Sequence, residues 1–263
     1  MVSILVQSVI LLLASLAHAE VIAGTNFEAR NWNYIDNFRE GELTKTVDSS
    51  TNAITSTLTN GLTWVSGKPG RGNAINFDGA NDIVVVPSAS EGLFDFSVNS
   101  TFTIIVLFKN PSGGDNRIFA SKVTWPADGW VFRTGPSGAK LGVYYRMGNG
   151  NHYYGCAGIT NAMFINGNWH TAALVFRGKI DAVSGTEFWF DGVKYATTDE
   201  TGTGGGTMQN NANLVIGNTE GIIFTNYVDE IGAVMVSRDG YAPDATGMMS
   251  LHRRLMGQVG QVP

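Results

Sequence analysis

The chain has 263 residues, of which 43% are hydrophobic and 15% are charged, and its formal net charge is −5 at pH 7. This composition suits one large all-β domain or two small ones, because β-sandwiches often exceed the usual domain length. The acidic balance and the scattered lysines and arginines argue against nucleic acid as a partner.

The N-terminus is a nearly apolar run from Ile4 to Leu16, followed by Ala17-His18-Ala19 before Glu20. This pattern predicts a secretory signal peptide over residues 1–19 and an exported single domain over residues 20–263. No Lys or Arg precedes the run. If it is retained, it is short for a membrane span and would form a buried strand or an anchor that contacts a membrane.

The stretch Gly67–Pro87, "GKPGRGNAINFDGANDIVVVP", places two β-rich runs on either side of a short Gly/Asn/Asp loop. Such a pattern predicts a β-hairpin. Asp78, Asn81 and Asp82 supply three oxygen-bearing side chains within this one loop, and Ca²⁺ takes six to eight oxygen ligands from turns of this kind. The same residues are also ordinary turn formers, so the loop is either a turn or part of a calcium site.

Further along the chain, Thr101–Asn110 is apolar on both faces, which predicts a strand in the middle of a sandwich. Trp169–Gly178 predicts another buried strand. Asp191-Gly192 follows Phe188-Trp189-Phe190 and precedes a second β-rich run, so we expect a tight type I′ hairpin turn. The predicted core consists of alternating apolar positions of these and neighbouring strands: Phe77, Ile104, Val106, Phe108, Leu174, Phe188, Phe190, Val215, Ile231 and Val234.

The loop-rich middle of the chain holds the "YYRMGNGNHYYGC" segment, which ends at its only cysteine, Cys156. A lone cysteine predicts a small buried hydrophobe and allows no intrachain disulfide. Aromatic faces stack on pyranose rings while polar neighbours hold the hydroxyls, so the segment is a candidate sugar-binding surface. The alternative is that half of these aromatics alternate into the core. The candidate ligand-binding residues come from this segment and from residues 125–133. They are Trp125, Arg133, Tyr145, Arg146, His152 and Tyr153.

The C-terminal "APDATGMMSLHRRLMG" predicts one short helix. Asp244 can cap its N-terminus, and Gly257 can end it. Met248, Leu251 and Leu255 lie along one face of that helix and should be buried.

The order of these motifs carries a family resemblance. The motifs "DSSTN", "FTIIVLFK", "NWHTAALVF", "EFWFDGVKY", "NLVIGN" and "YVDEIGAVMVSR", together with the Gly67–Pro87 stretch, lie within roughly residues 43–256. The chain resembles the LamG-like jelly-roll domains of the concanavalin A-like lectin/glucanase superfamily. The resemblance implies an all-β fold, a two-sheet antiparallel jelly-roll sandwich, here with a short C-terminal helix.

The resemblance also implies a structural Ca²⁺, for which Asp229 would join Asp78, Asn81 and Asp82. Enzymes of the superfamily carry paired acidic residues on one strand, because one carboxyl protonates the leaving group while the other attacks or activates water. No such strand is evident here. Asp229 and Glu230 are adjacent and would point to opposite faces of a strand, and Glu187 stands alone. A lyase with a Tyr/His pair is a weaker alternative for the aromatic segment.

These observations favour a secreted, non-catalytic carbohydrate-binding or adhesion domain whose partner is a glycan or cell-surface polysaccharide. The alternative is a structural protein of a surface or virion (coat, spike or filament subunit), which would form homo-oligomers. A polysaccharide-cleaving enzyme ranks last.

Overall fold

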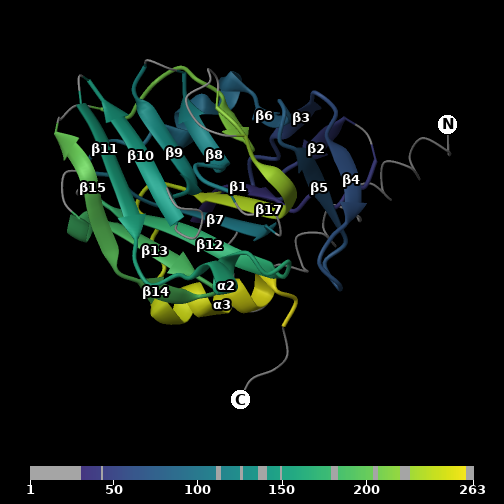
Figure 1. The fold of residues 1–263 in the computed structure, drawn as a ribbon. Coiled ribbons are helices and arrows are strands. Elements are labelled where there is room, and N and C mark those ends of the chain that lie inside the picture. The colour runs from purple at the N-terminus through teal and green to yellow at the C-terminus, as the bar shows by residue number, and fades with distance from the viewer. Residues whose placement is uncertain are drawn as a thin grey trace.

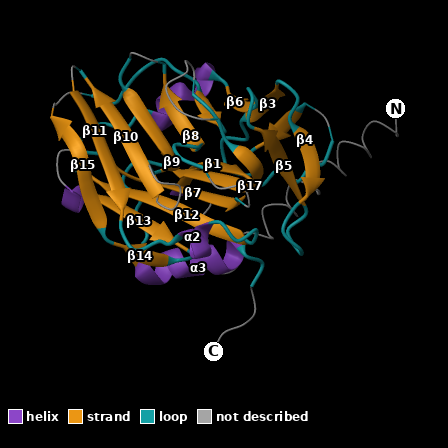
Figure 2. Cartoon of the chain, in the orientation of Figure 1, coloured by secondary structure: helices purple, strands orange, loops and turns teal. Residues whose placement is uncertain are grey.

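The computed structural model of the chain describes residues 31–42, 44–110, 114–124, 127–135, 141–148, 150–178, 183–203, 207–219 and 226–258. The predicted signal peptide, residues 1–19, and the candidate ligand residue Trp125 lie outside the described residues. The described residues form two antiparallel sheets packed as a sandwich, which confirms the predicted fold class (Figures 1 and 2).

The first sheet, sheet A, has β7 near its centre and a long last strand that pairs on both of its edges. Its strands, in spatial order, are β14 (Val193–Tyr195), β13 (Thr186–Phe190), β12 (Trp169–Arg177), β7 (Thr101–Lys109), β17 (Val228–Ser237), β5 (Asn73–Asp78) and β4 (Thr63–Ser66), with β1 (Trp32–Asp36) also paired to β17.

The second sheet, sheet B, contains the aromatic segment of the middle of the chain. Its strands, in spatial order, are β15 (Thr197–Thr203), β11 (Gly150–Cys156), β10 (Leu141–Met147), β9 (Gly129–Thr134), β8 (Ile118–Val123), β16 (Leu214–Ile216), β6 (Ile83–Val86), β3 (Thr55–Thr59) and β2 (Lys45–Val47). In Figure 1, β15, β11, β10, β9 and β8 run side by side as one layer.

The helical elements are short, apart from the last one. In the part of the chain that the structure describes, they are the 3₁₀ helix η2 (Ser88–Phe94), α2 (Asn161–Phe164), the 3₁₀ helix η3 (Val183–Gly185) and α3 (Ala245–Leu255). The predicted C-terminal helix is confirmed: Asp244 accepts a hydrogen bond from the Gly247 backbone N–H at 2.8 Å, and Gly257 follows the helix with φ of 70°.

The main core lies between the two sheets. Alternate residues of the strands point into it, and rings from opposite sheets meet there, as Phe108 of β7 and Phe119 of β8 do with centroids 4.8 Å apart. All of the residues predicted for the core are buried: Phe77, Ile104, Val106, Phe108, Leu174, Phe188, Phe190, Val215, Ile231 and Val234. Val215 is buried on the outer side of sheet B rather than in the main cluster.

The two runs of the Gly67–Pro87 stretch do not form the predicted hairpin. β5 belongs to sheet A, where β4 and β17 occupy both of its edges, and β6 belongs to sheet B. Residues 79–82 therefore cross from one sheet to the other. Turn residues between two apolar runs predict a reversal of the chain, but they do not specify whether the second run pairs with the first or lies across the core from it.

The predicted Asp191-Gly192 turn is present. Both residues have positive φ, 49° and 78°, and Phe190 pairs with Val193 across the turn. These are the backbone angles that a type I′ turn requires.

A buried carboxylate joins the two sheets at the N-terminal side of the sandwich. Asp36 at the end of β1 accepts hydrogen bonds from the Tyr34 hydroxyl at 2.8 Å and from the Thr46 hydroxyl of β2 at 2.7 Å. Burial raises the pKa of Asp36 to about 7. This group therefore binds its proton over a pH range in which an exposed aspartate is ionised.

Candidate functional site

The outward face of sheet B carries the polar and aromatic residues that could meet a ligand. Register across the sheet aligns Val131 of β9 with Tyr144 of β10 and Tyr153 of β11. Arg146 and Asn151 form the neighbouring pair of the same face. Because residues two apart on a strand share a face, these side chains lie side by side. We call Arg133, Tyr144, Arg146, Asn151 and Tyr153 the tyrosine–arginine face.

Asn151 is at the centre of the hydrogen bonds on this face. Its Oδ1 accepts one bond from the Tyr144 hydroxyl at 2.8 Å and another from a guanidinium nitrogen of Arg146 at 3.1 Å. Burial raises the pKa of Tyr144 to about 12, with Arg146 acting in the opposite direction, so the hydroxyl keeps its proton and donates it. Among the described residues, the Asn151 amide nitrogen has no partner, and the Asn151 side chain is partly exposed.

Tyr153 is the aromatic group of this face that reaches solvent. Its ring packs against Tyr144 with centroids 4.8 Å apart, and the Arg133 guanidinium carbon lies 5.9 Å from its ring centroid. Tyr144 and Arg133 are almost fully buried, at 0% and 2% exposure, whereas Tyr153 is partly exposed. Tyr153 is therefore held by buried neighbours on one side and is open on the other.

The structure separates the candidate ligand residues. Arg133, Arg146 and Tyr153 share the outward face, whereas Tyr145 and His152 pair with each other on the inward side. Tyr145 has no exposed surface and belongs to the main core, and His152 is 6% exposed and lies near Tyr154. The reason is strand alternation, which sends neighbouring residues of "YYR" and "NHYY" to opposite faces.

Two residues of the tyrosine–arginine face, Tyr144 and Asn151, are not among the ligand-binding residues predicted from the sequence. Both occur at a spacing of two residues from a candidate, Tyr144 from Arg146 and Asn151 from Tyr153. Once the segment is recognised as two paired strands, this spacing identifies them. Without the register, the same segment is also compatible with a loop.

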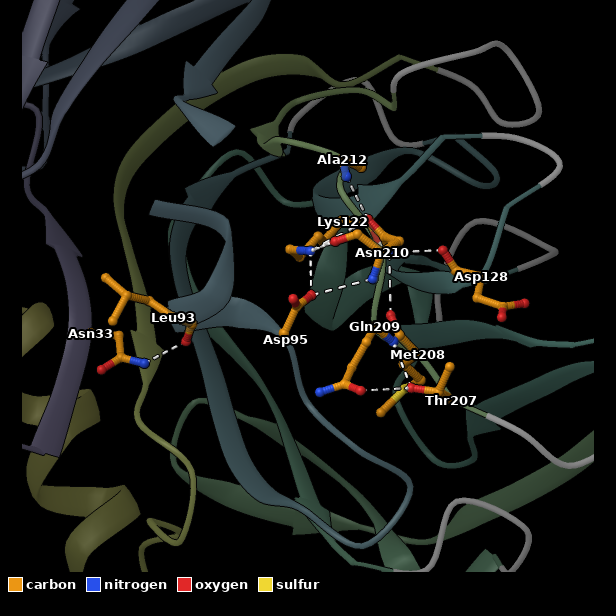
Figure 3. A network of polar contacts seen from close by, with 10 residues as sticks. All are labelled: Asn33, Leu93, Asp95, Lys122, Asp128, Thr207, Met208, Gln209, Asn210 and Ala212. Atoms are coloured by element: carbon orange, nitrogen blue, oxygen red, sulfur yellow. Dashed lines mark hydrogen bonds and ion pairs between the residues drawn. The ribbon is translucent and has the colours of Figure 1, made fainter. Parts of the chain in front are cut away.

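A buried lysine supports sheet B at the end of β8 (Figure 3). Lys122 has no exposed surface, and its Nζ donates to Asp95 Oδ1 at 2.5 Å and to the Asn210 carbonyl at 2.6 Å. The Asn210 amide donates back to the carbonyls of Lys122 and Asp128, at 3.1 and 2.7 Å. The network fixes the segment before β16 and the segment after η2 against sheet B, because a buried charge is tolerated only where it is paired.

The predicted calcium residues occupy the crossing between β5 and β6 and the start of β17. Asp78 and Asp82 close the loop with their own backbone: Asp82 Oδ2 accepts from the Asp78 N–H at 2.9 Å, and Asp78 Oδ1 accepts from the Ala80 N–H at 2.7 Å. Val228 pairs with Asp78, which brings Asp229 to the next position on the neighbouring strand. The loop and Asp229 therefore lie at the same end of sheet A.

The donor set of this loop fits a calcium ion only in part. Asp82 is 2% exposed, its Oδ1 has no hydrogen-bond partner among the described residues, and burial raises its pKa. This is the state expected of a carboxylate oxygen that lacks a cation or a donor. In contrast, the carbonyls of Ala80 and Asn81 already accept from the amides of Asn226 and Asn60. In the part of the chain that the structure describes, no three His, Cys, Asp or Glu side chains are grouped to hold a metal.

Glu187, the isolated acid, has a structural role in sheet A. Its carboxylate accepts from Arg177 Nε at 2.9 Å and from Lys194 Nζ at 2.7 Å. Burial by itself would raise the pKa of Glu187, but these hydrogen bonds and charges outweigh it and lower the pKa. A general acid needs a raised pKa, so this carboxyl is unsuited to that role.

Among the described residues, no helix has both the length and the apolar character that a membrane span requires.

No family model matches the sequence, and no curated protein matches it. Solved structures do resemble its fold. The binding domain of Paraclostridial Mosquitocidal Protein 1 aligns with a TM-score of 0.59 and 13% identity, over 86% of this chain and 52% of that one. The binding domain of Botulinum Neurotoxin DC in complex with SialylT aligns with a TM-score of 0.56 and 12% identity, over 86% and 52%.

Domain 4 of AbnA, a GH43 extracellular arabinanase from Geobacillus stearothermophilus solved in complex with arabinotriose, aligns with a TM-score of 0.57 and 15% identity. The alignment covers 84% of this chain and 98% of that domain. The chain thus spans about half the length of the toxin binding domains and nearly all of the arabinanase domain. At these identities the likeness establishes a shared β-sandwich fold.

Proposed function

We propose that the chain is a non-catalytic glycan-binding domain and that the tyrosine–arginine face of sheet B is its binding surface. The observation that carries the proposal is the partly exposed ring of Tyr153 beside the Asn151 amide and the Arg146 guanidinium. An aromatic ring offers an apolar platform to the C–H face of a sugar, while the amide and guanidinium donate to its hydroxyls. The held geometry of Tyr153 means that little side-chain entropy is lost on binding.

The structural neighbours support the same proposal. One neighbour was solved with arabinotriose and another with SialylT. The alignment with the arabinotriose-bound domain covers nearly the whole length of that domain. The motif order of the chain further supports placing it among LamG-like, concanavalin A-like jelly rolls. Under this proposal the domain is exported and meets its partner outside the cell, at a glycan or cell-surface polysaccharide.

A glycan array probed with the purified chain tests the proposal. We expect binding to a restricted group of glycans, retained when EDTA is present if sheet B alone makes the contacts. Reducing-sugar and unsaturated-product assays on the same glycans should show no turnover. Absence of binding to every glycan on the array, at protein concentrations up to the millimolar range, would contradict it.

The structural Ca²⁺ remains a proposal of its own, supported by the buried and unpartnered Asp82 Oδ1. In it, Asp78, Asn81, Asp82 and Asp229 would hold the ion. Binding would require Asp229 to approach the loop, because the described residues hold no group of three carboxylates at metal-binding distance. The ion would offset the repulsion between these carboxylates and join β17 to the crossing loop. A ligand that binds only the folded state stabilises it by about 2.7 kcal/mol at a hundredfold excess over the dissociation constant. EDTA should therefore lower Tm, Ca²⁺ should restore it, and Asp229→Ala should abolish both effects.

Assembly into a coat, spike or filament is the alternative that the sequence leaves open. Among the described residues, the large hydrophobic side chains that are exposed are Val47 and Val193. These two are too few to form an apolar patch of the size typical of stable interfaces. Light scattering on the full chain measures its oligomeric state and tests this alternative directly.

A further inference from the structure

Two arginines come close to each other where the turn between β4 and β5 meets the segment after β1, and β4 lies on the opposite side of the fold from β15 (Figure 1). Arg71 lies in that turn, and Arg39 follows β1. A methyl group placed on Gly72 would lie 3.8 Å from Cγ of Arg39, so the Arg39 side chain runs along the turn beside Arg71. The Asn73 amide donates to the Arg39 carbonyl at 3.0 Å and holds the two segments together.

Neither guanidinium has a counter-charge in the part of the chain that the structure describes. Arg71 is 9% exposed, and none of its side-chain nitrogens makes a hydrogen bond or ion pair with a described residue. Arg39 is partly buried, and its Nε is fully buried without a hydrogen-bond partner. This arrangement is unusual, because buried arginine is normally paired with a carboxylate or with carbonyl oxygens.

The electrostatic environment agrees with the geometry. Burial, and then the charge of Arg39, lower the pKa of Arg71 to about 10. Burial lowers the pKa of Arg39 as well. Within the described ranges, no carboxylate contributes to either pKa shift. Two like charges held together in a partly dehydrated place repel, and a bound anion relieves both the repulsion and the missing hydrogen bonds.

Other basic groups lie in the same turn and on α3, near His252. Lys68 in the same turn and Arg253 on α3 both act on His252 by their charge. A methyl group on Gly257, just after α3, would lie 3.6 Å from Cδ of Arg71, so the end of α3 covers the stem of this side chain. The carboxylate of Glu40, which follows Arg39, accepts from the Val47 N–H at 3.0 Å, and it is not among the groups that shift the pKa of Arg39 or Arg71. The carbonyl end of α3 offsets only about half a charge.

We propose that Arg39 and Arg71 form a binding site for a tetrahedral oxyanion, a sulfate or phosphate group, in free form or as an ester on a sugar. A guanidinium presents a fork of N–H donors that matches two oxygens of such an anion. Two guanidiniums side by side therefore hold one anion from two directions. The rigid turn fixes one of them, since the Gly67 N–H donates to the Gly72 carbonyl at 2.9 Å and the Arg71 N–H donates to the Lys68 carbonyl at 2.9 Å.

This site is separate from the tyrosine–arginine face and does not depend on it. It also differs from a polyanion-binding face, which needs many cations in a row. A single anion held by two arginines is compatible with a net charge of −5.

The test measures Tm and binding heat for the full chain with millimolar sodium sulfate or sodium phosphate, against sodium chloride at matched ionic strength. The variants Arg71→Gln and Arg39→Gln each remove one guanidinium and keep most of the stem. Arg238→Gln is the matched control, because Arg238 is exposed and follows Ser237, which pairs with Trp32 at the other end of β1. Arg71→Lys keeps the charge without the fork.

We expect a saturable rise in Tm with sulfate and phosphate for the unmodified chain and for Arg238→Gln, a weaker rise for Arg71→Lys, and none for Arg71→Gln or Arg39→Gln. Dextran sulfate binding with the same pattern would show that sugar esters are accepted, and binding of the inorganic ions alone would restrict the site to free anions. Equal shifts in all variants would overturn the proposal, because sulfate also stabilises folded proteins without a site. If Arg71→Gln fails to fold, Arg39→Gln, at a partly exposed residue, decides the question alone.

Discussion

Strand alternation gives each sheet an outer face, and the two outer faces differ in polarity and in exposure. On sheet A, the register row of Trp189, Ala173, Ile105, Met235 and Ile35 is apolar throughout and buried. The C-terminal helix covers this face with Met248, Leu251 and Leu255 (Figure 1).

On sheet B, the equivalent row passes from exposed Thr57 through Val85, Val215, Ser121 and Val131 to Tyr144 and partly exposed Tyr153. Ser121, in the middle of the row, donates to the Asn218 carbonyl at 2.7 Å, so the segment after β16 reaches this part of the face.

This contrast indicates which of the two outer faces is available to a ligand. A face that buries an apolar row under its own helix contributes stability, since each fully buried large apolar side chain is worth about 1.5–3 kcal/mol. A face whose row ends in a tyrosine flanked by an amide and a guanidinium leaves polar groups for a ligand. Changes on sheet A should therefore alter stability without altering ligand affinity, and changes at the exposed end of sheet B should do the reverse.

The largest loss of stability is expected at the buried Lys122 network of sheet B. Lys122→Met removes the charge that pairs with Asp95 and leaves the Asn210 carbonyl without its donor. Breaking a buried ion pair by removing one partner costs about 3–5 kcal/mol. Urea unfolding measures this loss of unfolding free energy. The double variant Lys122→Met with Asp95→Leu should recover part of the loss, and a loss below about 1 kcal/mol for the single variant would mean that the network contributes little.

The covered face of sheet A should respond next most strongly. Leu251→Ala opens a cavity between α3 and the sheet and should lower the unfolding free energy by about 2–5 kcal/mol. Glycan affinity of the folded protein should be unchanged, which isothermal titration measures. A change in affinity equal to that of a sheet B variant would remove the distinction between the two faces.

A smaller loss of stability is expected at the Asp191-Gly192 turn, which contacts α3. Gly192 has φ of 78°, and a methyl group there would lie 3.0 Å from Cε of Met249 and 3.1 Å from Cβ of His252. Gly192→Val should cost about 1–3 kcal/mol, from backbone strain and displacement of α3. Gly240→Val is the control, because Gly240 has φ of 84° with no atom within 4 Å of the added group. If the two variants unfold at the same temperature, contact with α3 adds nothing to the strain.

Acid pH should loosen the covered face through His252. Burial lowers the pKa of His252 below its ordinary value, with Asp191 acting in the opposite direction, and its Nδ1 lies 2.8 Å from the Thr171 hydroxyl. Folding thus favours the neutral ring, so this contribution is complete above the ordinary pKa of about 6.5 and is lost as pH falls through the folded-state pKa.

Tm measured between pH 7.5 and pH 5 should therefore fall more for the unmodified chain than for His252→Gln. Asp36 acts in the opposite direction, because its raised pKa makes its contribution decline as pH rises towards 7. For this reason the difference between the two proteins is the informative quantity. Equal slopes would show that His252 is not protonated in this range.

Much of the architecture could be predicted from local patterns. The two-faced apolar run at Thr101–Lys109, the Asp-Gly turn and the capped C-terminal helix each contain their own signal, and each is present. The failed hairpin between β5 and β6 shows the limit. The edges of β5 are taken by β4 and by β17, and β17 lies about 150 residues further along the chain. A short window of sequence holds no information about that partner.

The candidate ligand-binding residues show the same limit, because the register divides them between two faces of sheet B. Arg133, Arg146 and Tyr153 were identified by residue type, and so were Tyr145 and His152, which point inward. Composition cannot separate these two sets, because only the strand register assigns a face. The Arg39–Arg71 pair gives no local signal at all, since it arises where two turns from different parts of the chain meet.

Substitution of two tyrosines on opposite outer faces tests whether the ligand binds to sheet B. The glycan identified on the array is titrated into Tyr153→Ala, Asn151→Ala and Tyr241→Ala, the last being a partly buried tyrosine on the sheet A side, 5.4 Å from Trp32 between ring centroids. We predict that Tyr153→Ala and Asn151→Ala each weaken the affinity by about tenfold or more, equivalent to about 1.4 kcal/mol, and that Tyr241→Ala leaves the affinity unchanged. Unchanged affinity in both sheet B variants, or a matching loss in Tyr241→Ala, would contradict the assignment of the binding surface to sheet B.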